Sequence, residues 1–383
     1  MTFDQLGIWG GLVMTNIRFF SAVLLLGLAV FWNPASASGS VPCDSSFYSG
    51  YQSCVNFGSC SPYSSPAEYV SAHPHCFPAG ASASQVTMAG SSFQQISAIS
   101  GALSSRLVGD AGPGLLAGTP QQGMAAGGKN AWNVWGNVMD GSTRQSYTVK
   151  NSAIKNDMDV TNAVLGADYA VSPGMVIGVS AAFDHGSGNT QPGAGNAWSA
   201  STVKGYAVAP YLGYQISKEL ALDASFGLGS GKTSAAGGME SQGDRSFYAA
   251  NLSYSQWFKE IQVTGKFGYL HGEEAFGQSK VNGTAIANTE MKNKVDRWQL
   301  GAQAGYWMGN GVQPYLGLSY LGDRRSSSGA VTDPVGKSAW QWALGLNFFS
   351  LSSGITGGIA YTQEDGRSNQ KNNALTANIG LRF

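Results

Sequence analysis

The chain has few charged residues. Lys, Arg, Asp and Glu together make up 11% of its 383 residues, less than half of the roughly 25% found in typical soluble domains. Its 22 basic and 22 acidic side chains cancel, so the charge balance gives no reason to expect nucleic acid or an acidic substrate as a partner. Much of its polar character comes instead from Ser, Asn and 53 Gly residues. We therefore expect part of its surface to face something other than water.

Long hydrophobic runs are also missing. The longest, FFSAVLLLGLAVFW at 19–32, is too short for a membrane-spanning helix, which needs about 20 residues. Arg18 precedes this run, and the small-residue site 35–37 follows it. This order predicts a secretory signal peptide over residues 1–37, cut after Ala37. An uncleaved membrane anchor is the alternative, which the length of the run disfavours, and either Met1 or Met14 could head the leader.

Cysteine is absent from residue 77 onward. All four cysteines follow the predicted leader, at Cys43, Cys54, Cys60 and Cys76. Export favours two disulfides among them, and the sequence leaves all three pairings open. The HPHC stretch at 73–76 lacks the paired spacing of a zinc site, so we expect no metal and no other cofactor. Residues 38–90 are rich in Ser, Pro and Gly, and they predict a small disulfide-closed head or a partly disordered segment.

One short amphipathic helix is predicted after this head. Apolar residues recur every three or four positions in residues 91–107, at Phe93, Ile96, Ile99, Leu103 and Leu107. That spacing places them on one face of a helix, with Ser91 or Ser92 as its N-cap. A loop rich in Gly, Pro and Gln follows and reaches residue 130. Residues 91–130 are thus expected to link the head to the rest of the chain.

From residue 131 onward the hydrophobic period is two. For example, Trp298, Leu300 and Tyr306 share one face of a strand, while Arg297 and Gln299 share the other. Such alternation indicates strands with unlike environments on their two faces. Twelve strands are predicted, at 131–140, 159–171, 174–185, 202–216, 219–231, 245–258, 260–272, 294–308, 311–322, 337–349, 353–363 and 373–383.

The connections between these strands alternate in length. Short turns of one to three residues alternate with long polar loops, which are predicted at 141–158, 186–201, 232–244, 273–293, 323–336 and 364–372. An even number of strands, with short turns at one end and long loops at the other, is the plan of an outer-membrane barrel. The predicted fold is therefore an all-β membrane protein, a twelve-stranded antiparallel transmembrane β-barrel over 131–383 with a short N-terminal helix in its lumen.

The composition of the two strand faces decides which one points outward. One face carries Gly, Ser, Asn, Gln and a few charges, including Lys266, Arg297 and Arg382, and is too sparsely charged for a soluble exterior. The other carries aromatic residues toward strand ends, such as Trp132 and Tyr169, which suits the girdles at the lipid interfaces. We expect the first face to line the lumen and the second to contact lipid. The last strand must then pair with the first, because hydrocarbon offers no partner to an open edge.

Four stretches of the sequence resemble the autotransporter β-domain of Gram-negative outer membranes. They are AWNVWGNVMDG at 131–141, AVLGADYAVSPGMVIGVSAAFDHG at 163–186, GYAVAPYLGYQIS at 205–217 and ALTANIGLRF at 374–383. The resemblance implies a twelve-stranded barrel with a helix through the lumen, which acts as a translocator for its own N-terminal passenger (type V secretion). It also implies monomeric insertion into outer-membrane lipid with the help of periplasmic chaperones and the barrel-assembly machinery. The family's C-terminal assembly signal maps onto Leu375, Ile379, Leu381 and Phe383.

Two features depart from the family's usual pattern. Its passengers are commonly hundreds of residues long, whereas only 38–90 is available here. Some members cleave themselves at an Asn in the lumen helix, but residues 91–129 contain no Asn, so no such cleavage is expected. The favoured function is an outer-membrane translocator that anchors, and exports to the cell surface, its short passenger. The alternative is a passive pore-forming or structural barrel whose N-terminal segment plugs the lumen.

An enzymatic function is not expected. The sequence contains no P-loop, dinucleotide fingerprint or nucleophile elbow. The barrel region has two histidines, His185 and His271, each beside acidic residues near the predicted loop end. Surface positions explain them better than an acid pair at the barrel rim.

We predict that deletion of Phe383 impairs barrel assembly far more than deletion of one residue from a long loop. By the resemblance above, the terminal aromatic residue is part of the signal recognised during insertion. The fraction of heat-modifiable, membrane-inserted protein measures assembly. Equal effects of the two deletions would show that the last residue carries no such signal.

Overall fold

The computed structural model describes the residues of the barrel and one helix. The described ranges are 94–102, 132–149, 152–172, 174–192, 198–235, 239–281, 283–285, 290–309, 311–328, 335–350 and 354–382. The predicted leader, the head with its four cysteines, and Phe383 lie outside them. No helix within the described ranges is long and apolar enough to cross a membrane.

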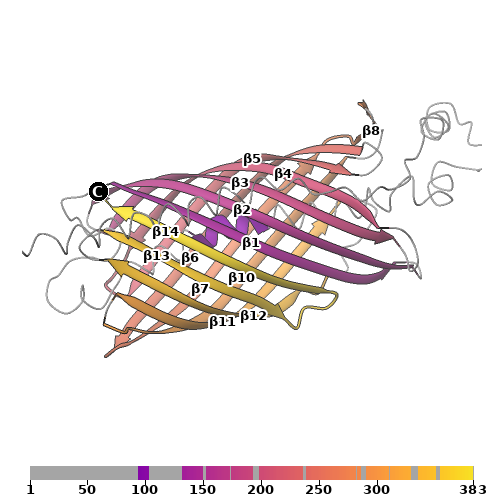
Figure 1. Ribbon diagram of the computed structural model, residues 1–383. Helices are drawn as coiled ribbons and strands as arrows, with labels where there is room; N and C mark the ends of the chain where they lie inside the picture. The colour runs from indigo at the N-terminus through magenta and orange to yellow at the C-terminus, as the bar shows by residue number, and fades with distance from the viewer. Residues whose placement is uncertain are drawn as a thin grey trace, which may run out of the picture. The chain divides into compact units, whose positions relative to one another are not determined.

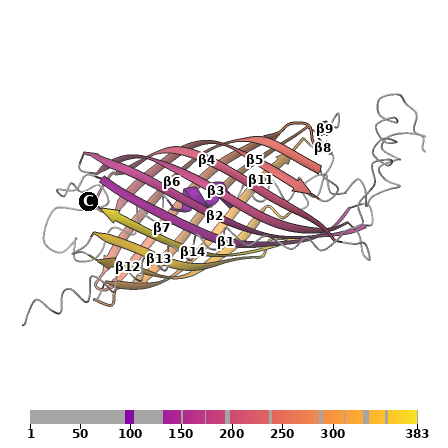
Figure 2. The same cartoon turned by 45° about the horizontal axis from the view of Figure 1, so that its top comes forward.

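Twelve long strands form the wall of the barrel (Figures 1 and 2). They run from 11 residues in β13 to 21 residues in β2. Their bounds are β1 Trp132–Val149, β2 Ser152–Ser172, β3 Met175–Pro192, β4 Ser199–Gln215, β5 Leu220–Ala235, β6 Met239–Phe258, β7 Ile261–Phe276, β10 Met291–Tyr306, β11 Val312–Ser327, β12 Ser338–Ser350, β13 Ile355–Asp365 and β14 Gln370–Arg382. Two further strands of two residues each, β8 Lys280–Val281 and β9 Thr284–Ala285, form a small hairpin, in which β8 pairs with the start of β6.

The sheet closes on itself. Each long strand pairs antiparallel with its neighbours in the chain, and β1 pairs with β14 from Asn133↔Arg382 to Gln145↔Gln370. The twelve-stranded closed antiparallel barrel predicted from the sequence is therefore confirmed. Closure gives the first and last strands the partners that an edge strand lacks.

The six predicted long loops were wrong in extent. The loop expected at 141–158 is a hairpin whose ladder continues to Val149↔Ser152. The β3–β4 ladder likewise reaches Thr190↔Ser199, and the β5–β6 ladder reaches Ala235↔Met239. Hydrophobic alternation ends where a strand leaves hydrocarbon, but backbone pairing continues beyond that level. The sequence pattern therefore marked the lipid-facing part of each strand and missed its extension.

The opposite end of the barrel has tight turns, as predicted. The backbone angle φ is positive at five turn positions, Lys259, Gly174, Gly309, Gly311 and Gly354. Four of these five turn positions are glycine, which reaches this conformation without steric cost. The short turns and the long hairpins therefore lie at opposite ends of the barrel, which is the arrangement of an outer-membrane barrel with short periplasmic turns.

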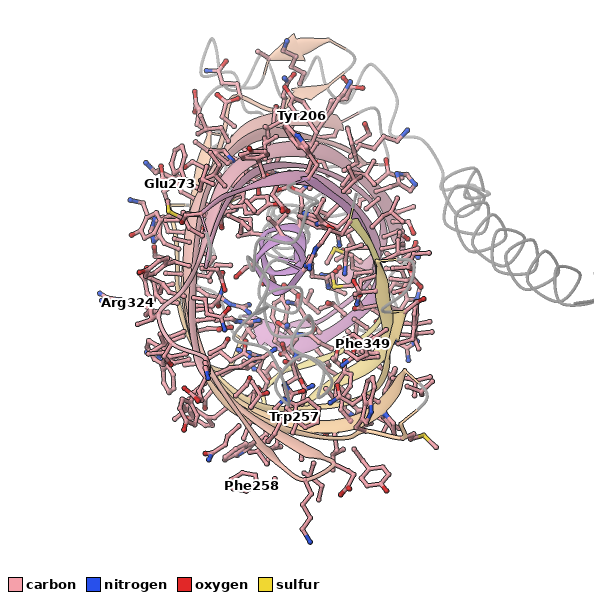
Figure 3. All side chains as sticks on the ribbon, turned by 90° about the vertical axis from the view of Figure 1, so that its left-hand side faces the viewer. Tyr206, Trp257, Phe258, Glu273, Arg324 and Phe349 are labelled. Carbon is pink, nitrogen blue, oxygen red and sulfur yellow. The ribbon has the colours of Figure 1, made fainter. Side chains whose placement is uncertain are left out.

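The two faces of each strand have the predicted orientation. Large apolar side chains point outward and are about half exposed on the isolated chain, including Trp132 (53%), Leu300 (59%) and Leu344 (58%). Seen along the barrel in Figure 3, Phe258 and Arg324 project away from the wall, whereas Phe349 lies on its inner side. The apolar face therefore contacts lipid and the polar face lines the lumen.

Several aromatic rings cover a glycine on a neighbouring strand. A Cβ added to Gly227 would overlap the Phe247 ring, one added to Gly166 would overlap Trp135, and one added to Gly178 would stand 2.6 Å from the Tyr211 hydroxyl. Phe247 and Trp135 are buried on the inner face. The glycine gives each ring space to lie flat against the wall, so ring and glycine act as one packing unit.

Gly227→Ala should therefore destabilise the folded barrel. The added methyl would displace the buried Phe247 ring, and overpacking of this kind costs about 1–3 kcal/mol. Gly265→Ala is the matched control, because a Cβ there meets nothing within 4 Å. Urea unfolding followed by heat-modifiable gel migration compares the two variants. If both variants unfold at the same urea concentration, the glycine at 227 is not needed for the ring.

Candidate functional site: the lumen and its helix

A helix at residues 94–102 lies inside the barrel, surrounded by the ring of strands in Figure 3. Ile96 and Ile99, two members of the predicted apolar stripe, are buried against inward side chains that include Trp135 and Leu270. The other stripe residues, Phe93, Leu103 and Leu107, are not among the described residues. Gln95 on the same helix is also fully buried (0% exposed). The sequence predicted one buried face, but the lumen encloses the helix on more sides, so its polar residues are buried as well.

Hydrogen bonds from both halves of the helix fix it to the wall. Gln94 Nε2 donates to Thr143 Oγ1 on β1 at 2.6 Å. Arg245 on β6 donates to Gln95 Oε1 at 2.9 Å. At the other end, Asn251 Nδ2, also on β6, donates to Ser100 Oγ at 3.1 Å.

These contacts define the direction of the helix. Both Gln95 and Ser100 bond to β6, which starts at the long-hairpin end with Met239 and ends at the short turn after Phe258. Gln95 contacts the earlier residue of that strand, Arg245, and Ser100 contacts the later one, Asn251. The N-terminal end of the helix therefore points toward the long hairpins, and its C-terminal end points toward the short turns.

Arg245 is the central side chain of this site. Its side chain is 1% exposed, and it forms ion pairs of 2.7 Å with both Asp184 on β3 and Glu274 on β7. A Cβ on Gly205 or Gly231 would collide with the guanidinium, so the two glycines leave a flat path along which Arg245 crosses β5 and β4. One cation thus joins three strands and the helix. Its own burial is offset by two carboxylates, as a buried charge requires.

A second charged cluster lies on the inner wall between β10 and the β13–β14 hairpin. Arg297 Nε donates to Asp323 Oδ1 at 2.7 Å and its NH2 group to Oδ2 at 2.8 Å, a bidentate pair. Arg367, in the turn before β14, bonds to Asp323 at 2.7 Å and to Glu364 at 3.1 Å. Arg325 pairs with Asp323 at 3.0 Å. The cluster ties β10, β11 and the β13–β14 hairpin together from inside.

Amide side chains continue this polar network across the seam of the barrel. Gln145 on β1 donates to Gln370 on β14 at 3.0 Å, which joins the first and last strands by side chains as well as backbone. Asn156 on β2 donates to Gln145 at 3.1 Å, and Thr190 on β3 donates to Asn156 at 3.1 Å. All four side chains are buried. The lumen is therefore lined at this level by hydrogen-bonded side chains.

The residues singled out in the sequence occupy different places. Arg297 joins the second charged cluster, while Lys266 lies on the inner face of β7 and interacts electrostatically with Asp223. Arg382 is half-buried at the short-turn end of β14, so these three cations form no common site. On the outer face, Leu375 and Leu381 are 50% and 43% exposed, and Ile379 is half-buried. Ala37, the cysteines and Phe383 are outside the described ranges.

The two histidines lie in strands β3 and β7, within the predicted strands 174–185 and 260–272. On the outer face, His271 Nδ1 is 2.7 Å from Asp296 Oδ1, and its ring stacks on Tyr248 with a centroid distance of 4.9 Å. His185 is half-buried on β3. Within the described part of the chain, no three His, Cys, Asp or Glu side chains are grouped so that they could hold a metal ion.

Sequence reasoning missed Arg245 and its partners. The prediction assigned Glu274 to a loop, and Arg245 stood at the very start of a predicted strand. The signal that could have identified Arg245 is the alternation of side chains along a strand. In the structure, Arg245 shares the inward side of β6 with Phe247 and Ala249. An arginine at an inward position of a barrel strand needs a buried acid, and that requirement could have prompted a search for one.

A closed antiparallel barrel with short turns at one end, a lipid-facing apolar belt and a helix inside the lumen defines a class of outer-membrane protein. Residues 134–362 match the family model of the autotransporter β-domain, which is more than half of the chain. The chain belongs to the autotransporter β-domain family, and the fold is that of a Gram-negative outer-membrane protein. No match is found among curated protein sequences.

Solved structures show the same fold. The translocator domain of the autotransporter NalP from Neisseria meningitidis aligns with a TM-score of 0.51 and 10% identity, over 66% of this chain and 89% of that one. The β domain of the Bordetella autotransporter Brka aligns with a TM-score of 0.52 and 14% identity, over 66% and 100%. The transport unit of the autotransporter AIDA-I from Escherichia coli aligns with a TM-score of 0.51 and 12% identity, over 76% and 99%. At these identities the similarity establishes the fold alone.

Arg245→Met should destabilise the barrel strongly, because Asp184 and Glu274 would remain buried without their cation. Removal of one partner from a buried pair typically costs about 3–5 kcal/mol. Lys232→Met is a matched control, since the Lys232–Glu240 pair is half exposed and such surface pairs contribute about 0–1 kcal/mol. The free energy of unfolding in urea measures both. A loss for Arg245→Met no larger than that of the control would contradict the role assigned to Arg245.

Proposed function

We propose that this barrel is a translocator that anchors its own short N-terminal passenger, residues 38–90, and exports it to the cell surface. The observation that carries the proposal is the direction of the lumen helix. Gln95 contacts β6 nearer the long hairpins and Ser100 contacts it nearer the short turns. The N-terminal end of the helix therefore faces the side of the long hairpins, which is the extracellular side in outer-membrane barrels.

The connection on the other side of the helix fits this route. β1 begins with Trp132 at the short-turn end, where β14 also finishes. The C-terminal end of the helix points toward the same end, and residues 103–131 connect the two. A single pass through the lumen then separates the predicted passenger on the outside from the start of the barrel on the periplasmic side.

The family supports the same function. Two structures of the same fold are described as a translocator domain and a transport unit, and translocation of an N-terminal passenger is the role that the family implies. In this proposal the lumen is the export path of the short passenger, and the helix that remains in the lumen anchors it. Arg245, Asn251 and Thr143 supply the contacts that keep this anchor in place.

A passive pore or structural barrel is the alternative, and it is less well supported. The packed helix, with Gln95 and Ile99 fully buried, fits both functions, because the alternative also places the N-terminal segment in the lumen. A plug that enters directly from a periplasmic head would point in the opposite direction. The direction of the helix therefore favours the translocator.

Protease treatment of intact cells tests the proposal. Epitope tags are placed in separate proteins at Ser45 in the passenger, within residues 286–289 of a long hairpin, and at Ser217 in a short turn. We expect protease to remove the tags at Ser45 and in the long hairpin, and to spare the tag at Ser217 until the outer membrane is permeabilised. If the Ser45 tag survives while the long-hairpin tag is cleaved, the passenger is not at the cell surface and the proposal is wrong.

A further inference from the structure

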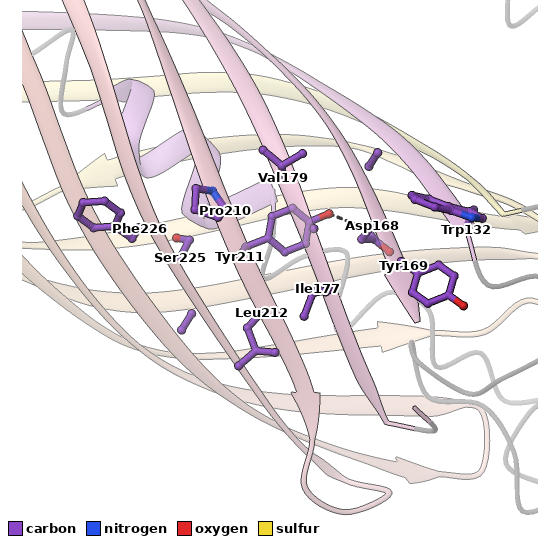
Figure 4. Close-up of a pocket in the computed structure, with 13 residues that line it drawn as sticks. Trp132, Asp168, Tyr169, Ile177, Val179, Pro210, Tyr211, Leu212, Ser225 and Phe226 are labelled. Carbon is purple, nitrogen blue, oxygen red and sulfur yellow. Dashed lines mark hydrogen bonds between the residues drawn. The ribbon is translucent and has the colours of Figure 1, made fainter. Parts of the chain in front are cut away.

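A groove of about 730 Å³ lies in the wall formed by β1 to β5, at the end of the barrel with the short turns (Figure 4). Its volume is in the range of small-molecule sites, roughly 300–1,000 Å³. Most of its lining belongs to the outward face of the strands, including Trp132, Tyr169, Ile177, Val179, Leu212 and Phe226. The groove therefore opens toward the membrane.

Two rows of register partners form the sides of the groove. One row runs across the strands through Trp132, Tyr169, Ile177 and Leu212 to Ala224, each paired with the next. The neighbouring row, one step further from the short turns, runs through Ala167, Val179 and Pro210. Ala167 and Ala224 have the smallest side chains of these two rows, and the outer surface is hollowed beside them.

The groove also coincides with a break in the wall. The β4–β5 ladder has Val208↔Leu228 and then Tyr211↔Ser225, so the two positions between them form no ladder pairs although the register is unchanged. Pro210, which has no N–H to donate, stands in this gap opposite Phe226. Proline within a sheet is confined to edges and bulges, so its presence inside a lipid-facing ladder marks a specialised part of the barrel.

The chemistry of the lining selects the ligand. Asp168 is the single charged residue that lines the groove, and it is buried on the inner side, where the Tyr211 hydroxyl donates to it at 2.6 Å. The outward lining offers alkyl and aromatic surface and no ionic partner, which suits a hydrocarbon chain. At the short-turn end stand the paired rings of Trp132 and Tyr169, 5.1 Å apart. Tyr and Trp prefer the level of lipid headgroups, so a chain in the groove would have its headgroup at that end.

We propose that this groove is a lipid-binding site that holds one acyl chain of a phospholipid from the periplasmic leaflet. The short turns mark the periplasmic side of outer-membrane barrels, which fixes the leaflet. The bound chain fills the hollow beside Ala167 and Ala224 and covers the ladder gap at Pro210. It differs from the exchanging lipid around the barrel because it lies in an open groove of the outer wall, lined by aromatic and aliphatic side chains.

Photocrosslinking tests this site. The full-length protein is folded into vesicles of phosphatidylethanolamine, a fraction of which carries a diazirine on one acyl chain, and the adducts are mapped by peptide mass spectrometry. We expect adducts on residues 167–179 and 210–226 to exceed, by several-fold, those on the outward residues of β10 and β12. A uniform distribution of adducts around the barrel would overturn the proposal.

A groove-filling variant provides the second arm. Ala224→Phe should reduce the adducts on 167–179 and 210–226 several-fold while the total over the rest of the barrel stays unchanged. The matched control is Ala302→Phe, which adds the same ring to an outward alanine on the far wall and should leave the groove adducts as they are. Heat-modifiable migration checks that both variants are folded. Equal groove adducts in Ala224→Phe and the parent would show that the lipid does not occupy the cavity.

Discussion

The requirement that every backbone N–H and C=O in hydrocarbon has a partner governs this structure. An unpaired group there costs several kcal/mol, so the chain cannot leave β1 or β14 as an open edge. The ladder from Asn133↔Arg382 to Gln145↔Gln370 removes that edge. Closure in turn creates an enclosed lumen, in which polar side chains bond to one another, as Gln145 does to Gln370 across the seam. The seam of the barrel and the polar character of its interior have the same cause.

The interior contains two buried charge clusters and a helix. Arg245 reaches Asp184 over Gly231 and Gly205 of the intervening strands and pairs with Glu274 on the adjacent strand. The same guanidinium bonds to Gln95 of the helix. The helix is thus held by the groups that hold the wall together. A helix fixed in this way has a defined direction in the lumen, and the proposal of an extracellular passenger rests on that direction.

The sequence alone was sufficient for the strand number, the closure and the orientation of the two faces, because lipid on one side and polar lumen on the other impose a period of two. It was insufficient for strand lengths, since a strand such as β1 loses its hydrophobic alternation beyond the membrane while its pairing continues to Val149. It was also insufficient for the site. Asp184, Arg245 and Glu274 are far apart in the chain, and only the register of β3, β6 and β7 brings them together. Arg297 was assigned to the lumen from its parity, but its partner Asp323 was assigned to a loop.

The function proposed for the barrel depends on the placement of the helix in the lumen with its N-terminal end toward the long hairpins. Short bifunctional maleimide crosslinking in intact outer membranes tests it most directly, in a chain whose four natural cysteines are replaced by serine. The pair Ile96→Cys with Gly272→Cys should crosslink, since Ile96 Cδ1 lies against Gly272, and so should Ser100→Cys with Asn251→Cys. We expect these two pairs to crosslink, with no crosslink between 96 and 251 or between 100 and 272. Crosslinking of the exchanged pairs instead would show that the helix points in the opposite direction.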